Sequence, residues 1–223
     1  MSNPLIVALD TPSMEDALTL AKGVGDAAGA FKVGMELFYA AGPDAVRAIE
    51  APVFLDLKLH DIPTTVARAV RALAPLAPAM VNVHALGGRA MMEAAAAEKP
   101  HGTALLAVTV LTSLSAADLA EMGMPAPAEA VRLLTHLAMA SGCDGVVCAP
   151  ADLAAVREIS PAGFLRVTPG VRLRGESHDE HARAGTPKEA MRAGATHLVV
   201  GRPVTRDPDP RASAQRILEE LGA

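Results

Sequence analysis

One unit recurs along the whole chain and constrains its fold most: a short apolar run, a polar or glycine-containing turn, and an amphipathic helical segment. Eight runs have the length and apolar content of buried β-strands. They are Leu5–Leu9, Phe31–Met35, Val53–Lys58, Met80–His84, Ala104–Leu111, Gly145–Cys148, Phe164–Thr168 and His197–Val200. Helical patterns lie between them, for example Ser13–Ala27, Thr64–Leu76, Ala128–Ser141, Pro187–Ala193 and Asp209–Leu221.

Alternation of strands and helices predicts a parallel sheet, because parallel strands need crossover connections. The runs are apolar without strict alternation, as in strands that are buried on both faces. Eight units in 223 residues favour an α/β fold of the (β/α)8 TIM-barrel type, since an open six-stranded sheet leaves two runs unexplained. We expect residues 1–223 to form one domain.

Composition excludes several classes of partner. The chain has one Tyr, four Phe, no Trp and a net charge of −5, so it offers neither stacking surfaces nor a basic excess for nucleic acid. Its longest apolar runs are far shorter than the roughly 20 residues that span a bilayer, and the N-terminus lacks the features of a signal peptide. Cys143 and Cys148 match neither a metal motif nor a disulfide framework. We expect a cytoplasmic protein with no membrane partner.

In such a barrel the active site lies at the carboxyl ends of the strands. Polar or charged residues end several of the predicted strands: Asp10, Lys32, Asp56, Lys58, His84, Thr112, Thr168-Pro169-Gly170 and Gly201-Arg202. A charge at the end of a buried strand is costly unless it is paired. These positions are therefore the candidate site.

The third predicted strand carries the most informative charges. Asp56 and Lys58 are two residues apart, so their side chains should point to the same face, and Asp61 follows in the next loop. Lys32 ends the neighbouring strand, close enough to pair with Asp56. An alternating array of two ammonium and two carboxylate groups keeps Lys58 charged, and a positioned ammonium can protonate a carbanion. From the spacing alone, a structural salt-bridge network remains the alternative.

The last two strand ends have the features of a phosphate site. Pro169, Gly170 and Arg172 follow the seventh predicted strand, and Gly201 and Arg202 follow the eighth. Glycines let backbone N–H groups approach an anion, and arginine offers a fork for phosphate oxygens. Ordinary turn glycines and surface arginines are the alternative.

These residues resemble the orotidine 5′-phosphate decarboxylase family, the last enzyme of de novo uridine monophosphate synthesis. The similarity runs from Val7-Ala8-Leu9-Asp10 through Phe31-Lys32-Val33-Gly34 to Thr168–Arg172 and Val200-Gly201-Arg202, essentially the whole chain. Its most specific part is FLDLKLHDIPTTV, which contains the family's D-x-K-x-x-D signature at Asp56, Lys58 and Asp61.

The resemblance implies a cofactor-free and metal-free decarboxylation of orotidine 5′-monophosphate. Lys58 would protonate C6 of the pyrimidine after CO2 leaves. Asp56 would lie beside the substrate carboxylate, and Lys32 would bind ribose and anchor the charged array. Asp10 would hold a ribose hydroxyl.

The resemblance also implies a homodimer with shared active sites. Asp61, with Ile62 and Thr65, would reach into the site of the partner subunit. The other implied substrate-binding residues are Thr112 at the pyrimidine, Pro169, and Arg172, Gly201 and Arg202 on the phosphate side. From their length and polar-to-mixed composition, Ser113–Pro127 and Leu173–Gly185 are expected to be long loops above the barrel mouth, and they are candidate lids that order when ligand binds.

One position departs from the family pattern. The loop after the seventh strand usually carries a glutamine that bridges pyrimidine and phosphate, and His181 aligns with it here. Histidine can donate to phosphate, or the contact moves to Arg174 or Arg183. These three alternatives stay open.

Two rival functions share parts of this pattern. The metal-dependent sugar-phosphate decarboxylases and aldolases have the same D-x-K-x-x-D spacing, but they place a glutamate near the end of strand two, where this chain has Lys32, whose charge would repel a divalent metal. A non-catalytic phosphate-binding barrel is the other rival. His84 is expected to be a core histidine, and His60 to be structural.

Overall fold

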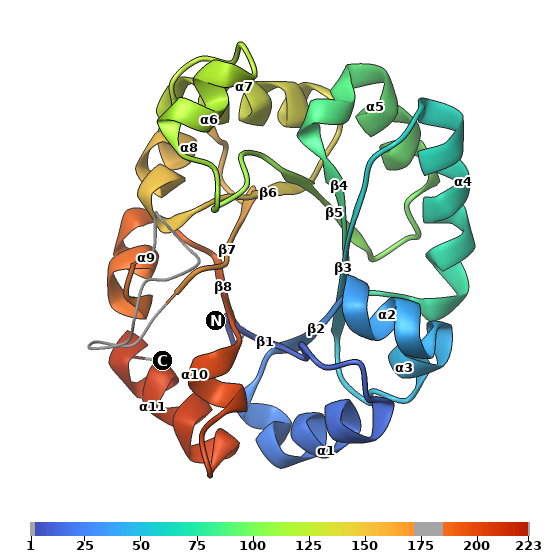
Figure 1. The fold of residues 1–223 in the computed structure, drawn as a ribbon, viewed down its shortest axis with the longest axis vertical. Helices are drawn as coiled ribbons and strands as arrows, with labels where there is room; N and C mark the ends of the chain where they lie inside the picture. The colour runs from blue at the N-terminus through green and yellow to red at the C-terminus, as the bar shows by residue number, and fades with distance from the viewer. Residues whose placement is uncertain (1–2, 172–184, 223) are drawn as a thin grey trace.

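A computed structural model describes residues 3–171 and 185–222, and in it eight parallel strands close into a barrel in sequence order (Figure 1). The strands are β1 (Leu5–Ala8), β2 (Ala30–Gly34), β3 (Val53–Leu59), β4 (Met80–His84), β5 (Ala104–Val108), β6 (Gly145–Val147), β7 (Leu165–Thr168) and β8 (His197–Val200). β1 pairs with both β2 and β8, which closes the sheet. The predicted (β/α)8 fold is confirmed.

Helices surround the strands as an outer ring (Figure 1). The α-helices are α1 (Met14–Val24), α2 (Met35–Ala41), α3 (Pro43–Arg47), α4 (Pro63–Leu73), α5 (Gly88–Glu98), α6 (Ala116–Glu121), α7 (Pro127–Ala140), α8 (Leu153–Ile159), α9 (Pro187–Ala193), α10 (Arg202–Thr205) and α11 (Pro210–Leu221). Short 3-10 turns are η1 (Gly25–Ala27), η2 (Ala74–Leu76), η3 (Ala85–Gly87) and η4 (Pro150–Asp152). None of the described helices is both long and apolar enough to span a bilayer.

The strands bury apolar side chains on both faces, as their lack of alternation predicted. A smaller cluster fills the barrel interior with Ile6, Ala8, Ala30, Phe54, Met80, Leu106, Val108, Val147, Val167 and Val199. The intervening strand residues pack outward against the helices in a second, larger cluster. In the described residues the interior is thus a packed core of mostly aliphatic side chains and not an open channel.

Several boundaries differ from the sequence prediction by a few residues. The fifth strand ends at Val108, before the polar Thr109, and Met35 begins α2 instead of ending β2. The predicted first helix ends earlier, at Val24, but Ser13 caps it as expected, since its side chain accepts a hydrogen bond from the Asp16 N–H at 3.1 Å.

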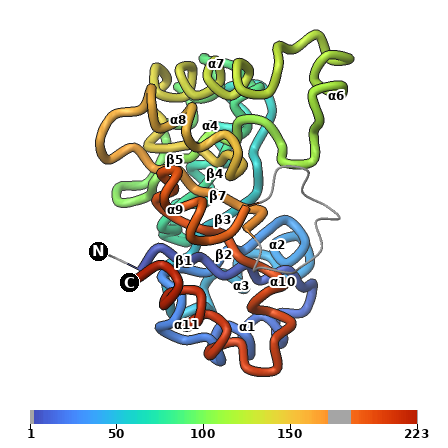
Figure 2. The backbone as a smooth tube through the Cα atoms, turned by 90° about the vertical axis from the view of Figure 1, so that its left-hand side faces the viewer, coloured from blue at the N-terminus to red at the C-terminus, as the bar shows by residue number. Residues whose placement is uncertain are grey.

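The segment Ser113–Pro127 was expected to be a loop, and this was wrong in part because it contains α6. Ser115 and Asp118 form a reciprocal capping box at the start of this helix. That motif stabilises a short helix in a segment with little apolar periodicity. In the side view, α6 projects from the same side of the barrel as α2 and α10, away from the two termini (Figure 2).

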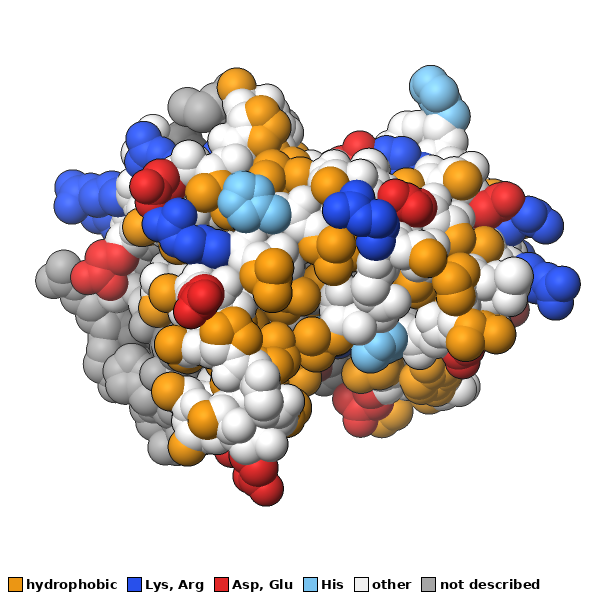
Figure 3. All heavy atoms as spheres, turned by 90° about the horizontal axis from the view of Figure 1, so that it is seen from above, with side chains coloured by type: hydrophobic (Ala, Val, Ile, Leu, Met, Phe, Trp, Pro, Cys, Tyr) orange, Lys and Arg blue, Asp and Glu red, His pale blue; other side chains and the backbone are white. Residues whose placement is uncertain are grey.

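The outer surface mixes charges of both signs. On the face over α5 and α7, basic and acidic side chains are interspersed with apolar ones (Figure 3). No continuous basic stripe crosses the described part of this view.

Candidate active site

A cavity of about 270 Å³ opens at the carboxyl ends of the strands. Its lining residues come from every strand except β4, or from the loops after those strands: Ala8, Asp10, Lys32, Phe54, Asp56, Lys58, Thr112, Val147, Pro169, Gly170, Val199, Gly201 and Arg202. The sequence-predicted residues Asp10, Lys32, Asp56, Lys58, Thr112, Pro169, Gly201 and Arg202 thus meet around one space.

Four charged side chains form a continuous chain along the wall of this cavity. Lys32 Nζ lies 2.9 Å from Asp10 Oδ1 and 3.5 Å from Asp56 Oδ2. The other oxygen of Asp56, Oδ1, lies 2.6 Å from Lys58 Nζ. The order is therefore carboxylate, ammonium, carboxylate, ammonium, and the predicted pairing of Lys32 and Lys58 with Asp56 is confirmed.

The second carboxylate of this chain is Asp10, where the sequence analysis expected Asp61. The Asp61 side chain is exposed, and its Oδ1 accepts a hydrogen bond from the Ile62 N–H at 2.6 Å. The reason is geometric. Ala8 of β1 and Phe54 of β3 lie level with Lys32, so Asp10 is two residues beyond that level along its chain segment and Asp61 is seven. A role for Asp61 in a partner's site stays a prediction.

Strand register and a glycine place the Lys32 ammonium. Lys32 lies opposite Ala8 of β1 and Phe54 of β3, so its side chain can reach the residues that follow both neighbours. Its ammonium turns back over Gly34, where a Cβ atom would lie only 3.1 Å from Nζ. The absence of a side chain at Gly34 leaves the space that the ammonium occupies.

The backbone at Lys58 is irregular, which the sequence did not indicate. Lys58 has φ of 50°, and the β3–β4 register shifts between Leu55 and Leu59. The contact between Asp56 and Lys58 was predicted from regular strand alternation. It exists, but it depends on this local distortion.

Asn82 is a site residue that the sequence analysis missed. It is fully buried on β4, accepts a hydrogen bond from the Lys58 N–H at 2.7 Å, and donates through Nδ2 to Asp56 Oδ1 at 2.7 Å. The available signal was an amide side chain in the middle of the otherwise apolar run Met80–Val83. A buried amide needs partners, and a strand end that carries charges can supply them.

The charged chain holds Asp56 in its ionised form. Burial of Asp56 raises its pKa. The nearby Lys32 and Lys58 ammonium groups, with the hydrogen bonds from Lys58 and Asn82, together lower it by more than burial raises it, so the pKa lies below its ordinary value. The carboxylate is therefore ionised at neutral pH despite a side-chain exposure of only 14%.

The predicted partner-reaching residues lie together but outside the cavity. Asp61 and Ile62 precede α4, Thr65 is in its first turn, and all three are exposed, with Ile62 64% exposed. Pro63 at the first helical position starts α4 directly after them.

The phosphate end is described in part. Pro169, Gly170, Gly201 and Arg202 line the cavity, and Gly170 has φ of 76°, a conformation that favours glycine. The predicted residues Arg172 and His181, and the alternatives Arg174 and Arg183, lie outside the described residues.

His84 is buried, as expected for a core histidine, and the exposed His60 lies against it. The rings of His84 and His60 stack with centroids 5.3 Å apart, and His84 Nδ1 accepts a hydrogen bond from the Leu86 N–H at 3.3 Å. Burial, followed by the neighbouring His60 and Lys58, lowers the pKa of His84 to about 4. His84 is therefore neutral at physiological pH.

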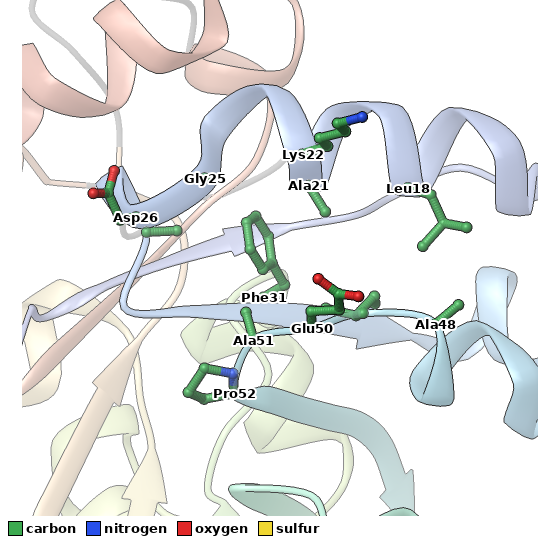
Figure 4. A pocket seen from close by; sticks show the side chains of 12 residues that line it. Leu18, Ala21, Lys22, Gly25, Asp26, Phe31, Ala48, Glu50, Ala51 and Pro52 are labelled. Carbon is green, nitrogen blue, oxygen red and sulfur yellow. The ribbon is translucent and has the colours of Figure 1, made fainter.

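A larger cavity of about 740 Å³ lies elsewhere, between α1 and the segment that leads into β3 (Figure 4). Leu18, Ala21 and Phe31 form its apolar part. Lys22 belongs to α1 on one side of the cavity, and Glu50 belongs to the segment before β3 on the other. It contains none of the predicted site residues and no buried charged pair. Size alone therefore does not identify the active site of this barrel.

Fold and site together define a barrel enzyme class: a closed (β/α)8 sheet with paired lysines and aspartates at its mouth, beside glycines and an arginine suited to an anion. The family model described as "Orotidine 5'-phosphate decarboxylase / HUMPS family" matches residues 3–217. The chain belongs to this family.

Individual relatives agree over nearly the full length. The chain is 50% identical over 228 residues to orotidine 5′-phosphate decarboxylase of Chromohalobacter salexigens, covering 99% of this chain and 97% of that protein. It is 52% identical over 226 residues to the Halorhodospira halophila enzyme of the same name, covering 98% and 96%. The crystal structure of the Lactobacillus acidophilus decarboxylase superposes with a TM-score of 0.86 at 39% identity, covering 99% and 100% of the two chains.

Proposed function

We propose that this chain decarboxylates orotidine 5′-monophosphate to uridine 5′-monophosphate (UMP) and CO2. Its relatives carry the name orotidine 5′-phosphate decarboxylase. The observation that carries the proposal is the continuous chain Asp10–Lys32–Asp56–Lys58 in the cavity at the barrel mouth. In this array Lys58 can donate a proton, and the carboxylate of Asp56 can repel a substrate carboxylate that lies beside it.

In the proposed reaction the bond between C6 and the carboxylate carbon breaks. CO2 leaves as a neutral molecule, and the electron pair stays on C6. Lys58 donates a proton from Nζ to C6, which completes UMP, and then regains a proton from water. Asp56 and the substrate carboxylate repel each other in the bound state, and this repulsion disappears as CO2 forms.

The remaining lining residues are proposed to bind the rest of the nucleotide. Asp10 and Lys32, which are paired with each other, are proposed to form hydrogen bonds with the ribose hydroxyls. Thr112 is proposed to form a hydrogen bond with a polar edge of the pyrimidine. Gly201 and Arg202 are proposed to hold the phosphate, together with Arg172. Binding energy from a phosphate remote from C6 can contribute to the chemical step.

The geometry of Lys32 supports a reaction without a metal ion. A divalent metal would use the carboxylates of Asp10 and Asp56, but the Lys32 ammonium already lies between them, at 2.9 and 3.5 Å. A second cation there would be repelled. The same argument disfavours the metal-dependent sugar-phosphate decarboxylases and aldolases as a model for this site.

We also propose that the chain acts as a homodimer in the cytoplasm on a free nucleotide, with neither nucleic acid nor membrane as a partner. The exposed group Asp61, Ile62 and Thr65 beside the mouth supports a site shared between subunits. Cys143 and Cys148 are both buried and form no disulfide, which is in keeping with a reducing compartment.

The test is an ultraviolet assay of orotidine 5′-monophosphate depletion by purified protein in EDTA. We expect turnover in EDTA equal to turnover after magnesium is added back, with UMP as the product. Absence of turnover would contradict the decarboxylase proposal. Activity lost in EDTA and restored by magnesium would instead favour the metal-dependent rival.

A further inference from the structure

The Asn82 amide occupies a fully buried position inside the barrel mouth. It lies on β4 between Met80, which belongs to the interior core, and His84, which stacks on His60. Both polar atoms of the amide have a partner: Oδ1 accepts from the Lys58 N–H, and Nδ2 donates to Asp56 Oδ1, each at 2.7 Å. These two partners, Asp56 and Lys58, are the last two members of the charged chain Asp10–Lys32–Asp56–Lys58.

The first contact stabilises a strained backbone. Lys58 has φ of 50°, a left-handed conformation that is unfavourable for a residue with a Cβ atom. The register shift between β3 and β4 also removes Lys58 from the regular strand ladder. A buried N–H without an acceptor is strongly unfavourable, so the Asn82 oxygen compensates for the ladder bond that this conformation gives up.

The second contact orients the Asp56 carboxylate. Oδ1 of Asp56 accepts from both Asn82 Nδ2 and Lys58 Nζ, while Oδ2 faces Lys32. Rotation of the carboxylate would break the Asn82 contact. The amide itself has one possible orientation, because the reverse would direct an NH2 group at the Lys58 N–H.

We propose that Asn82 is a positioning residue for the proton donor: it fixes the left-handed backbone of Lys58 and the rotation of Asp56, so that the Lys58 ammonium faces the reacting carbon. This proposal rests on the proposed decarboxylase function. Asn82 does not line the cavity, so it acts through Lys58 and Asp56 rather than on the substrate.

The decisive variant is Asn82→Asp, which keeps the shape of the side chain. The new carboxyl can still accept from the Lys58 N–H, but when ionised it cannot donate to Asp56 and it repels that carboxylate. The charged groups that face this position are Asp56 and Lys58 from β3 and Lys32 from β2, while β5 presents the apolar Leu106 and Val108. His84 on β4 is neutral above its pKa of about 4.

Protonation should restore the missing donor in this variant. Burial and the adjacent Asp56 favour the neutral form of the introduced carboxyl, so it takes up a proton as the pH falls from 8 toward 5. We expect the kcat of Asn82→Asp relative to the wild-type protein to be about 100-fold low at pH 8 and to recover at least 10-fold by pH 5. Asn82→Ala has no group to protonate, so its loss of kcat should not depend on pH.

Two further readouts separate positioning from a general structural effect. UMP affinity, measured by calorimetry, should change less than about threefold in Asn82→Asp, because UMP binding does not need the proton-donor alignment. Thr103→Val is a matched control that removes a buried hydrogen bond, 2.7 Å long to the Pro78 carbonyl, just before the start of β5 and away from the barrel mouth. It should lower stability without lowering kcat.

The proposal is contradicted if Asn82→Asp has wild-type kcat at pH 8, or if its loss is the same at every pH, as in Asn82→Ala. Wild-type turnover measured in parallel reports separately on the decarboxylase function. Amide hydrogen exchange of Lys58, followed by NMR, does not depend on turnover: protection should be present in the wild-type protein and lost in Asn82→Ala. Retained protection would also overturn the proposal.

Discussion

Among single residues, Gly34 decides where the Lys32 ammonium can lie. A Cβ atom at Gly34 would be 3.1 Å from Lys32 Nζ and 3.6 Å from Asp10 Oδ1. In Gly34→Ala we therefore expect the ammonium to move away from at least one carboxylate. The value of kcat/KM for orotidine 5′-monophosphate should fall about 10- to 100-fold, because a fall of that size corresponds to the free energy of one hydrogen bond to a charged group.

Gly23→Ala is the matched control, because a Cβ atom there meets nothing within 4 Å and the position lies inside helix α1. It should leave kcat/KM unchanged and stabilise the fold by about 1 kcal/mol. Equal steady-state kinetics for the two variants would show that the space at Gly34 is not needed.

His84 gives a residue-scale prediction for stability. Its folded pKa of about 4 lies below the 6.5 of an exposed histidine, so the unfolded chain binds the proton more tightly. Keeping His84 neutral therefore costs nothing above pH 6.5. As the pH falls from 6.5 toward 4, the free energy of unfolding decreases by up to about 3 kcal/mol because of this residue. In His84→Asn, urea unfolding at pH 7 and pH 4.5 should show a smaller decrease in stability than in the wild-type protein. An identical decrease would contradict the burial of a neutral histidine.

Some residues of the site could be predicted from the sequence and others could not. Asp56, Lys58 and Lys32 could be predicted, because charges at the ends of apolar strands need partners. Asn82 could not be assigned to them, because its two partners are 24 and 26 residues away in the chain. The left-handed backbone of Lys58 is a consequence of that non-local contact, so no local pattern encodes it.

At the scale of elements, the eight strands were predictable because each is a short apolar run followed by a polar turn. Helix α6 was not, since it is only six residues long and its start depends on a cap rather than on apolar periodicity. Strand ends were also placed imperfectly, as at Val108, where a polar residue ends the strand inside an apolar run.

Helix α6 leads to a prediction about ordering at the mouth. The Ser115 side chain accepts from the Asp118 N–H at 3.3 Å, and Asp118 Oδ2 accepts from the Ser115 N–H at 2.7 Å. If Ser113–Pro127 is a lid, saturating UMP should slow amide hydrogen exchange there. In Ser115→Ala without ligand, exchange in α6 should be faster, because loss of the cap costs about 1 kcal/mol.

Helix α11 serves as the internal control for this measurement, since it has its own cap from Asp209 and contributes no residue to the mouth cavity. Its exchange should not respond to UMP. Exchange in Ser113–Pro127 that is equally unaffected by UMP would refute the lid.

At the scale of the whole molecule, the scarcity of aromatic residues fits the barrel. The interior cluster contains one aromatic residue, Phe54, and otherwise aliphatic side chains and Met80. A layered interior of this kind needs branched aliphatic residues more than aromatic ones. Closure of the sheet could be predicted from the sequence, because eight repeated units are the number in a closed barrel. The association of subunits could not be predicted in this way, because it produces no repeat in the sequence of one chain.

The proposed shared site predicts complementation between inactive subunits. Asp61→Ala and Lys58→Ala variants, each almost inactive alone, should regain activity when mixed, because a hybrid dimer contains one site with both intact residues. At full subunit exchange from an equimolar mixture, about a quarter of wild-type activity is expected from statistics alone. Exchange confirmed by mass spectrometry without recovered activity would contradict the shared site.

The role of Lys58 as proton donor is tested by the turnover of orotidine 5′-monophosphate in EDTA by the Lys58→Ala variant. The comparisons are the wild-type protein and a Lys22→Ala variant, which changes an exposed lysine on α1. We predict that kcat falls at least about 10⁴-fold in Lys58→Ala while thermal unfolding stays cooperative and Lys22→Ala keeps full activity. A Lys58→Ala protein that retains a tenth or more of wild-type kcat would contradict the assignment of Lys58 as the proton donor.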